Sequence, residues 1–210
     1  MKICFATPAS SSDVKFWFYK SSMQTVWPPN STRIDLFSLG MGRVKAENSY
    51  AAIMLELNAD FLVIASVDAA WSPHTISALI AHNKPIIAAP SRNRFHPFHC
   101  HVCDSFDPLT NTLHTVQDPE ARKGLEQVVA CGGELSVFRR DLFLTMPPPW
   151  FCDSFVHPSA PKTAPPLSQD YNLCIQAATF GIPTFTDWDF WASHYADGLV
   201  TGRHGVMSYV

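Results

Sequence analysis

The sequence predicts an α/β fold in which helices flank a mostly parallel central sheet. Five consecutive apolar residues, Phe61–Ala65, are bounded by polar residues, which is typical of a strand buried on both faces. Helical patterns lie on both sides of this run, and a second short apolar run occupies residues 85–89. Because strands that alternate with helices favour parallel crossovers, we expect one layered domain.

The composition is that of a globular protein. Of the 210 residues, 47% are hydrophobic and 16% are charged, so we expect one domain spanning residues 1–210. The formal charge of −3 does not support DNA as a partner. No apolar stretch approaches the roughly 20 residues that cross a membrane. Residues 1–5 begin a strand rather than a signal peptide, which favours a cytoplasmic location and reduced cysteines.

The first half is expected to form a nucleotide-binding α/β layer over residues 1–90. Residues 13–23 are too crowded with aromatic side chains to assign. Apolar positions at helical spacing predict a helix over residues 43–58, and Ser72 followed by Pro73 is typical of a helix start. The expected order is strand 2–6, strand 33–37, helix 43–58, strand 61–65, helix 73–82 and strand 85–89.

The second half, residues 91–210, is less regular. The segment 90–123 is polar and is expected to be irregular, and the tail beyond Tyr195 is weakly patterned, as in a lid. Ser168 is expected to cap a helix that stops at Gly181. The remaining expected elements are a strand or strand pair over 128–138, a short helix over 139–144, the helix 168–180 and a last strand over 183–186.

Asp68 follows the central strand directly and is the first candidate for chemistry. Ligands of open α/β sheets bind at the carboxyl ends of the strands, which is where this carboxylate would lie. On its own, a carboxylate at a strand end is more often a cap for the next helix or an acceptor for loop amides.

The order of several further blocks resembles that of short GT-A-fold glycosyltransferases, which use nucleotide sugars and carry an Asp-X-Asp motif. Ser66-Val67-Asp68 stands in place of that motif. The other matching blocks are Cys4 to Pro8, Glu47-Asn48, Cys131-Gly132-Gly133-Glu134, Pro149-Trp150-Phe151, Ser168-Gln169-Asp170 and His194.

The resemblance implies one GT-A-like, Rossmann-like domain that moves a sugar from a nucleotide-diphosphate donor to an acceptor hydroxyl. Residues 1–90 would bind the nucleotide, and residues 91–210 the sugar and the acceptor, which could be a glycan, a protein or a modified nucleobase, including viral DNA. The implied donor contacts are Thr7, Pro8, Asn48, Ser66, Asp68 and Gly133.

The resemblance also implies roles in catalysis. Asp170 would take the proton from the acceptor hydroxyl, and Trp150 would stack on the acceptor, although it suits a core position equally well. Asp68 and His194 would hold Mn²⁺ or Mg²⁺, which stabilises a departing diphosphate.

Two departures from the family pattern support an alternative function. Ser66 replaces the first aspartate, and Glu47 replaces an arginine and places negative charge near the expected diphosphate. They favour a catalytically inactive nucleotide-sugar-binding protein. A third hypothesis is a zinc-binding module centred on Cys100 and Cys103, with the nearby histidines His96, His99 and His101.

Overall fold

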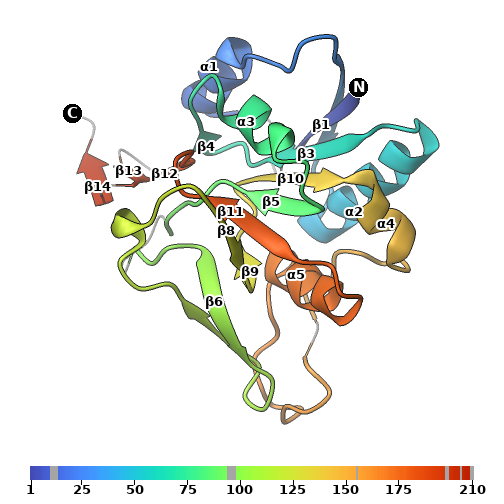
Figure 1. Cartoon of the computed structure of the whole chain (residues 1–210), viewed down its shortest axis with the longest axis vertical. Coiled ribbons are helices and arrows are strands. Elements are labelled where there is room, and N and C mark those ends of the chain that lie inside the picture. The colour runs from blue at the N-terminus through green and yellow to red at the C-terminus, as the bar shows by residue number, and fades with distance from the viewer. Residues whose placement is uncertain (10–13, 94–97, 155, 197–198, 204, 209–210) are drawn as a thin grey trace.

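The computed structural model describes residues 1–9, 14–93, 98–154, 156–196, 199–203 and 205–208. Its centre is a seven-stranded sheet in the order β2-β1-β3-β10-β5-β11-β8 (Figure 1). The strands are β1 (Lys2–Ala9), β2 (Thr32–Leu39), β3 (Phe61–Ala65), β5 (Ile86–Ala88), β8 (Leu125–Val128), β10 (Leu135–Arg139) and β11 (Thr184–Asp187).

Five of these strands run in one direction, and β10 and β8 run against them. The predicted mixed α/β class with a largely parallel sheet is therefore confirmed in this coarse form. The sequence did not predict the antiparallel β10, which pairs with β3 on one side and β5 on the other. Val137 of β10 lies opposite both Val63 and Ile87.

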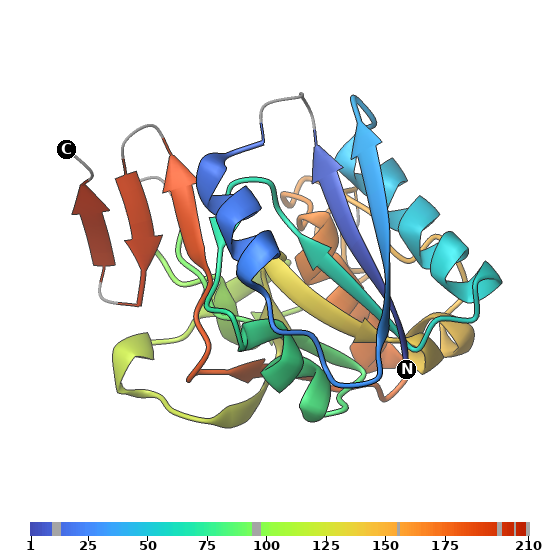
Figure 2. The same ribbon diagram turned by 90° about the horizontal axis from the view of Figure 1, so that it is seen from above.

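Two hydrophobic cores cover the two faces of the sheet (Figures 1 and 2). Helices α1 (Phe16–Gln24) and α3 (Thr75–Ala81) pack on one face; α2 (Arg43–Glu56), α4 (Arg140–Thr145) and α5 (Gln169–Thr179) pack on the other. Side chains alternate along a strand, so Phe5 of β1 packs in the core under α1 and α3, and the adjacent Cys4 packs in the core under α2, α4 and α5.

Some predicted boundaries were wrong. The aromatic-rich segment left unassigned forms α1, and α3 begins at Thr75 with His74 at its N-cap, not at Ser72-Pro73. The Ser72 carbonyl instead accepts a turn hydrogen bond of 3.1 Å from the Thr75 N–H. The predicted stop of α5 is supported, since Gly181 has a φ of +72°, a conformation that glycine adopts readily.

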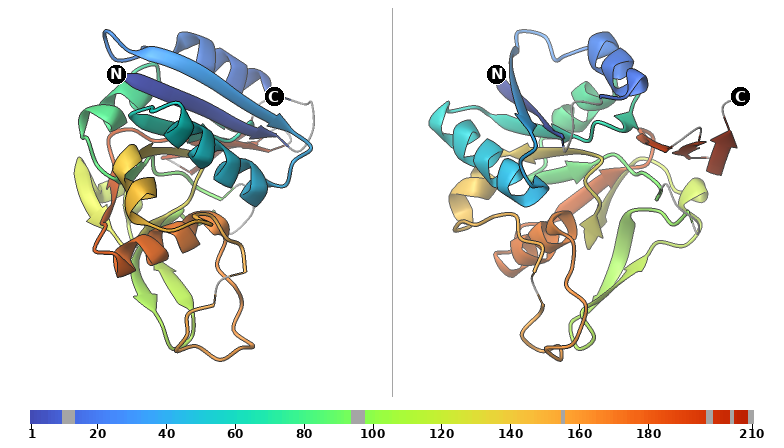
Figure 3. Two further views of the ribbon diagram at one scale, coloured as in Figure 1. Left: turned by 90° about the vertical axis from the view of Figure 1, so that its right-hand side faces the viewer. Right: turned by 180° about the vertical axis from the view of Figure 1, so that it is seen from behind.

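The segment predicted to be irregular contains a hairpin. Strand β6 (Val102–Asp107) pairs with β7 (Thr112–Thr115) on one side and with the short β9 (Ala130–Cys131) on the other, and a 3₁₀ turn lies at Pro119–Ala121. The hairpin and the proline-rich segment 156–167 project together from one end of the molecule (Figures 1 and 3). Among the described residues, no helix is both long and apolar enough to cross a membrane.

The strand predicted to be the last one over residues 183–186 forms β11, but it is not the last strand of the chain. Strands β12 (Ser193–Ala196), β13 (Leu199–Gly202) and β14 (Gly205–Ser208) follow it and form a second sheet with the two-residue β4 (Ala69–Ala70). Within this sheet His194 pairs with Ala69. The tail thus brings His194 to the carboxyl end of β3.

Candidate functional site

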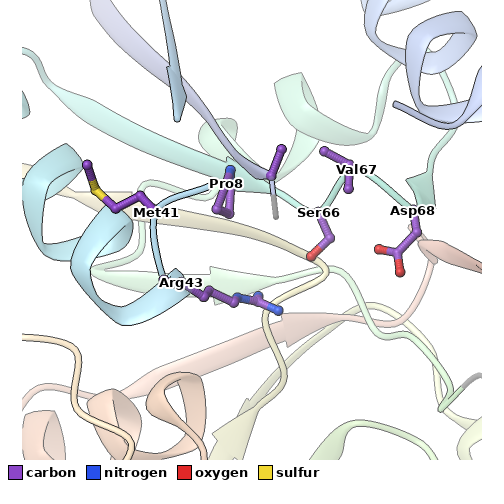
Figure 4. Close-up of a pocket in the computed structure, with 8 residues that line it drawn as sticks. Pro8, Met41, Arg43, Ser66, Val67 and Asp68 are labelled. Atoms are coloured by element: carbon purple, nitrogen blue, oxygen red, sulfur yellow. The ribbon is translucent and has the colours of Figure 1, made fainter. Parts of the chain in front are cut away.

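A pocket of about 210 Å³ lies at the carboxyl edge of the central sheet, between the ends of β1 and β3 and the start of α2. The guanidinium of Arg43, the hydroxyl of Ser66 and the carboxylate of Asp68 point into the same space (Figure 4). This is the edge at which open α/β sheets bind ligands. The lining residues are Pro8, Ala9, Met41, Gly42, Arg43, Ser66, Val67 and Asp68.

The structure brings together the two residues expected to hold a metal. His194 Nε2 lies 3.2 Å from Asp68 Oδ2, although 126 residues separate them in the chain. The backbone fixes this approach, because the Tyr195 N–H donates a 2.8 Å hydrogen bond to the Asp68 carbonyl. The Ala69 N–H donates a 3.0 Å bond to the Ser66 carbonyl, which closes the turn that carries Asp68.

Two further residues, Glu134 and His101, join this pair, and neither was a predicted metal ligand of the pocket. Glu134 Oε1 lies 3.7 Å from His194 Nδ1 and 3.5 Å from His101 Nδ1. One ligand atom from each of His101, Glu134 and His194 lies within 4.8 Å of the others. Glu134 belonged to a block that the resemblance had matched, and His101 to the histidine-rich segment. Local sequence gave no signal that the two would meet.

The neighbours of Glu134 determine its protonation. Burial alone would raise the pKa of Glu134, but the hydrogen bond to His101 and the charges of His194, Arg43 and His101 outweigh it and lower the pKa to about 2. Burial would also lower the pKa of His194, but Asp68 and Glu134 outweigh it and raise that pKa above its ordinary value. Glu134 is therefore an ionised, buried carboxylate at neutral pH.

The glycine pair before Glu134 is required for close packing. A Cβ at Gly132 would lie 2.7 Å from the Cβ of His101, and a Cβ at Gly133 would lie 3.1 Å from Arg43 Nη2. The Gly133 peptide also joins two side chains, since its carbonyl accepts a 2.9 Å bond from Arg43 and its N–H donates a 2.8 Å bond to Asp170 Oδ2. Glycine therefore lets two parts of the site approach each other.

Asp170 lies in the first turn of α5, as predicted, and is held on both oxygens. Oδ2 accepts the Gly133 N–H, while Oδ1 accepts the Tyr171 N–H at 2.9 Å and the Ser168 hydroxyl. Asp170 also contributes to the electrostatic field of Arg43. Asp170 and Arg43 therefore both lie against Gly133.

Glu47 does not line the pocket. It is 2% exposed, and its Oε1 accepts a 2.8 Å bond from Arg43 Nε. Burial raises the pKa of Glu47 to about 7 even though Arg43 opposes this shift. The negative charge that the sequence placed near a diphosphate thus lies behind Arg43 and orients it.

Three of the predicted donor contacts, Thr7, Asn48 and Gly133, lie outside the pocket lining. Thr7 is buried, and its carbonyl accepts a 3.0 Å bond from the Tyr50 hydroxyl. The Asn48 amide links α2 to the segment that carries Trp150 and Phe151. Its Nδ2 donates 2.8 Å bonds to the Val44 and Phe151 carbonyls, and its Oδ1 accepts a bond from the Trp150 N–H.

Trp150 has a core environment. It is 7% exposed, its Nε1 donates a 2.9 Å bond to the Met146 carbonyl, and its ring packs edge-on against Phe143 at 5.5 Å between centroids. Of the two roles that the sequence suggested for Trp150, a core residue and an acceptor-stacking residue, this placement corresponds to the first. One edge of Trp150 lines a different surface depression, together with Lys45 and Pro149.

The two cysteines of the zinc hypothesis are core residues. Cys100 and Cys103 are buried in the larger core, where desolvation raises the pKa of Cys100 to about 11 and that of Cys103 to about 12. Among the described residues, the group able to hold a metal contains His101 but neither cysteine. His96 lies outside the described residues.

Known structures share this fold. No protein-family model matches the chain, and no curated protein matches it. The crystal structure of A197 from STIV is 12% identical, with a TM-score of 0.67 over 100% of this chain and 95% of that chain. GalNAc-T7, solved with UDP, GalNAc and Mn²⁺, is 9% identical, with a TM-score of 0.58 over 91% of this chain and 43% of that chain. The chain therefore has a GT-A-like fold.

Proposed function

We propose that the protein is a glycosyltransferase that moves a sugar from a nucleoside-diphosphate donor to an acceptor hydroxyl. The observation that carries this proposal is the pocket at the carboxyl edge of the sheet, which Arg43 and Asp68 line, with His194 3.2 Å from Asp68. The similarity to GalNAc-T7, a structure with UDP, GalNAc and Mn²⁺, supports a nucleotide sugar as the donor class.

The residues present fit a divalent cation. Carboxylates combined with imidazoles suit Mn²⁺, whereas Mg²⁺ prefers oxygen ligands. Asp68 and His194 would hold the ion, and Glu134 and His101 are the neighbouring donors. When bound, such an ion neutralises negative charge on a departing diphosphate.

The chain's own residues supply the other requirements. Arg43, fixed by Glu47 and the Gly133 carbonyl, presents a positive charge to the pocket without having to reorganise. The backbone and side chains of Pro8 and Ser66 line the place of the donor. Asp170 is the proposed base for the acceptor hydroxyl, at the amino end of α5. The core position of Trp150 does not favour a role in acceptor stacking.

A second candidate is a nucleotide-sugar-binding protein without turnover. The observation that favours it is the engagement of Asp170, both of whose oxygens accept hydrogen bonds within the fold. Ser66 also offers a hydroxyl where the family pattern has a carboxylate. Such a protein would keep the pocket and bind the donor but would not accept a proton from a second substrate.

The test is release of nucleoside diphosphate from a panel of nucleotide sugars, with Mn²⁺ and with a chelator. We expect Mn²⁺-dependent turnover, and a loss of roughly 100-fold or more in Asp68→Ala and His194→Ala. The matched control is Asp189→Ala, because Asp189 is exposed and outside the pocket. Full activity in Asp68→Ala would contradict the proposed site. Calorimetric donor binding with no turnover would establish the second candidate.

A further inference from the structure

A second pocket, of about 370 Å³, lies on the opposite side of β12 from the metal-capable residues. Side chains alternate along a strand, so Ser193 and Tyr195 face this pocket while His194, between them, faces Asp68 and Glu134. We call this pocket the aromatic groove, because Trp17, Trp71, Trp191 and Tyr195 line it. Its volume lies at the lower end of the range for small-molecule sites, about 300–1,000 Å³.

Helix α1 forms one wall of the aromatic groove, and it lies beside β12 (Figure 2). Trp17, Lys20, Ser21 and Gln24 follow helical spacing and therefore present one face. The Trp17 ring stacks on the Tyr195 ring at 5.8 Å between centroids and 14° between planes. This contact fixes the distance between helix and strand.

Hydrogen bonds and aromatic contacts hold the floor of the groove in place. The Trp71 indole N–H donates a 2.9 Å bond to Thr25 Oγ1, and the Trp71 backbone N–H donates a 3.1 Å bond to Ser21 Oγ. The Trp71 ring also packs edge-on against Phe18 and Phe5, at 5.6 and 6.2 Å between centroids. A site whose rings are already positioned pays little ordering entropy when a ligand binds.

The polar groups of the groove determine the class of ligand. Besides the indole N–H groups they are four hydroxyls, one amide and one ammonium, from Ser21, Ser72, Ser193, Tyr195, Gln24 and Lys20, and no described residue of the lining is a carboxylate. Lys20 is the one cationic side chain in the lining, and its Nζ lies 4.9 Å from the Trp17 ring centroid. Lys20 thus already contacts an aromatic ring, and the remaining polar groups are uncharged, so they suit a ligand that carries hydroxyls.

We infer that the aromatic groove binds a pyranose ring of a neutral oligosaccharide. The faces of aromatic rings carry partial negative charge, so they attract the weakly positive C–H face of a sugar ring. The surrounding hydroxyls and the amide of Gln24 can satisfy the sugar hydroxyls, which otherwise lose hydrogen bonds to water. The site is separate from the proposed donor pocket and goes beyond the proposed transfer, since binding here requires neither a metal nor a donor.

The experiment fills the groove with one side chain. Gln24→Trp adds a bulky ring at an exposed lining position, and Met23→Trp adds the same ring one residue away, at a position that is 69% exposed and outside the lining. Binding of chitotriose, maltotriose and mannotriose is measured by calorimetry and by saturation-transfer NMR, in EDTA, with uridine as the nucleobase probe. We expect at least one trisaccharide to bind, with Kd raised roughly tenfold or more in Gln24→Trp and less than about twofold in Met23→Trp.

The outcomes separate this inference from the proposed function. Trisaccharide binding that persists in Asp68→Ala but is lost in Gln24→Trp supports the groove, whether or not the protein transfers sugar. Should Gln24→Trp not fold, Trp17→Leu takes its place with the same expected loss. Binding equal in Gln24→Trp and the parent, no binding of any trisaccharide, or groove-dependent binding of uridine alone would each overturn the inference.

Discussion

At the scale of single residues, two buried carboxylates near the pocket have opposite protonation behaviour. Glu134 faces His101 and His194, and the pKa of its carboxyl falls to about 2, whereas burial raises the pKa of Glu47 to about 7 with Arg43 alone as its close cation. The number of cationic neighbours decides the difference, because burial penalises both charges in the same direction. The ionised carboxylate of Glu134 is suited to binding a cation, and the carboxyl group of Glu47 orients the guanidinium of Arg43.

The raised pKa of Glu47 predicts a pH-dependent cost to stability. Between its ordinary pKa of 4.5 and about 7 the folded state binds more protons than the unfolded state, so the free energy of unfolding falls as pH rises through this window. The full effect is up to about 3 kcal/mol. Urea denaturation between pH 4.5 and 8 should show this decline in the parent and a shallower one in Glu47→Gln.

The control for this measurement is Glu56→Gln, on the exposed face of the same helix. It should keep the pH profile of the parent. An identical pH dependence in Glu47→Gln and the parent would show that Glu47 does not contribute the decline.

At the scale of elements, the side chain of Asn111 links the projecting hairpin to the proline-rich segment. Asn111, at the turn between β6 and β7, is 2% exposed and has a φ of +56°. Its Nδ2 donates a 2.8 Å bond to the Pro165 carbonyl, and its Oδ1 accepts a 3.0 Å bond from the His157 N–H. Asparagine suits this position because it tolerates the left-handed region and also bonds the neighbouring segment.

Two substitutions separate these contributions. Asn111→Ala should lower the free energy of unfolding by about 1–3 kcal/mol, since it leaves the backbone partners unpaired and strains the turn. Asn111→Gly keeps the backbone freedom but loses the amide, so it should recover part of that loss. Hydrogen exchange should rise in residues 156–167 in both variants. If exchange there is unchanged, the amide does not hold the segment.

The elements predicted from sequence were those with a strong local pattern. The apolar run of β3 and the helical spacing of α2 are visible in the sequence, so both elements could be predicted from it. Strands β6, β7 and β12 are short and have no clear periodicity, and they form because they pair with other strands. The site follows the same division. Asp68 and His194 were expected together through the family resemblance. Glu134 and His101 meet because β9 pairs with β6 and the Gly132 N–H donates a 2.6 Å bond to the His101 carbonyl, a long-range pairing that no local pattern predicts.

At the scale of the whole molecule, the proposed ion would join parts of the chain that are far apart in sequence. Asp68 follows β3, Glu134 precedes β10, and His194 lies on β12. A ligand that binds the folded state alone stabilises it in proportion to its occupancy. Metal binding should therefore raise the free energy of unfolding of the whole protein, which can be measured without any enzymatic assay.

Thermal unfolding tests this directly. At about 100 times its Kd, Mn²⁺ should add about 2.7 kcal/mol and raise Tm by roughly 5–10 °C, with a smaller rise for Mg²⁺. His194→Ala should remove the rise. His82→Ala is the control, because His82 pairs with Asp187 at 2.7 Å outside the cluster and should keep the rise despite any lower starting Tm. An undiminished rise in His194→Ala would contradict the proposed ligands.

The insertion of β10 has a consequence for dissecting the protein. Residues 1–90 contain β3 and β5 but not β10, the strand that lies between them in the sheet. A fragment with those boundaries would therefore expose the unpaired edges of two apolar strands. Strand edges of that kind recruit other chains. Expressing the two halves apart should therefore give aggregation, and complementation would require both polypeptides to be produced together.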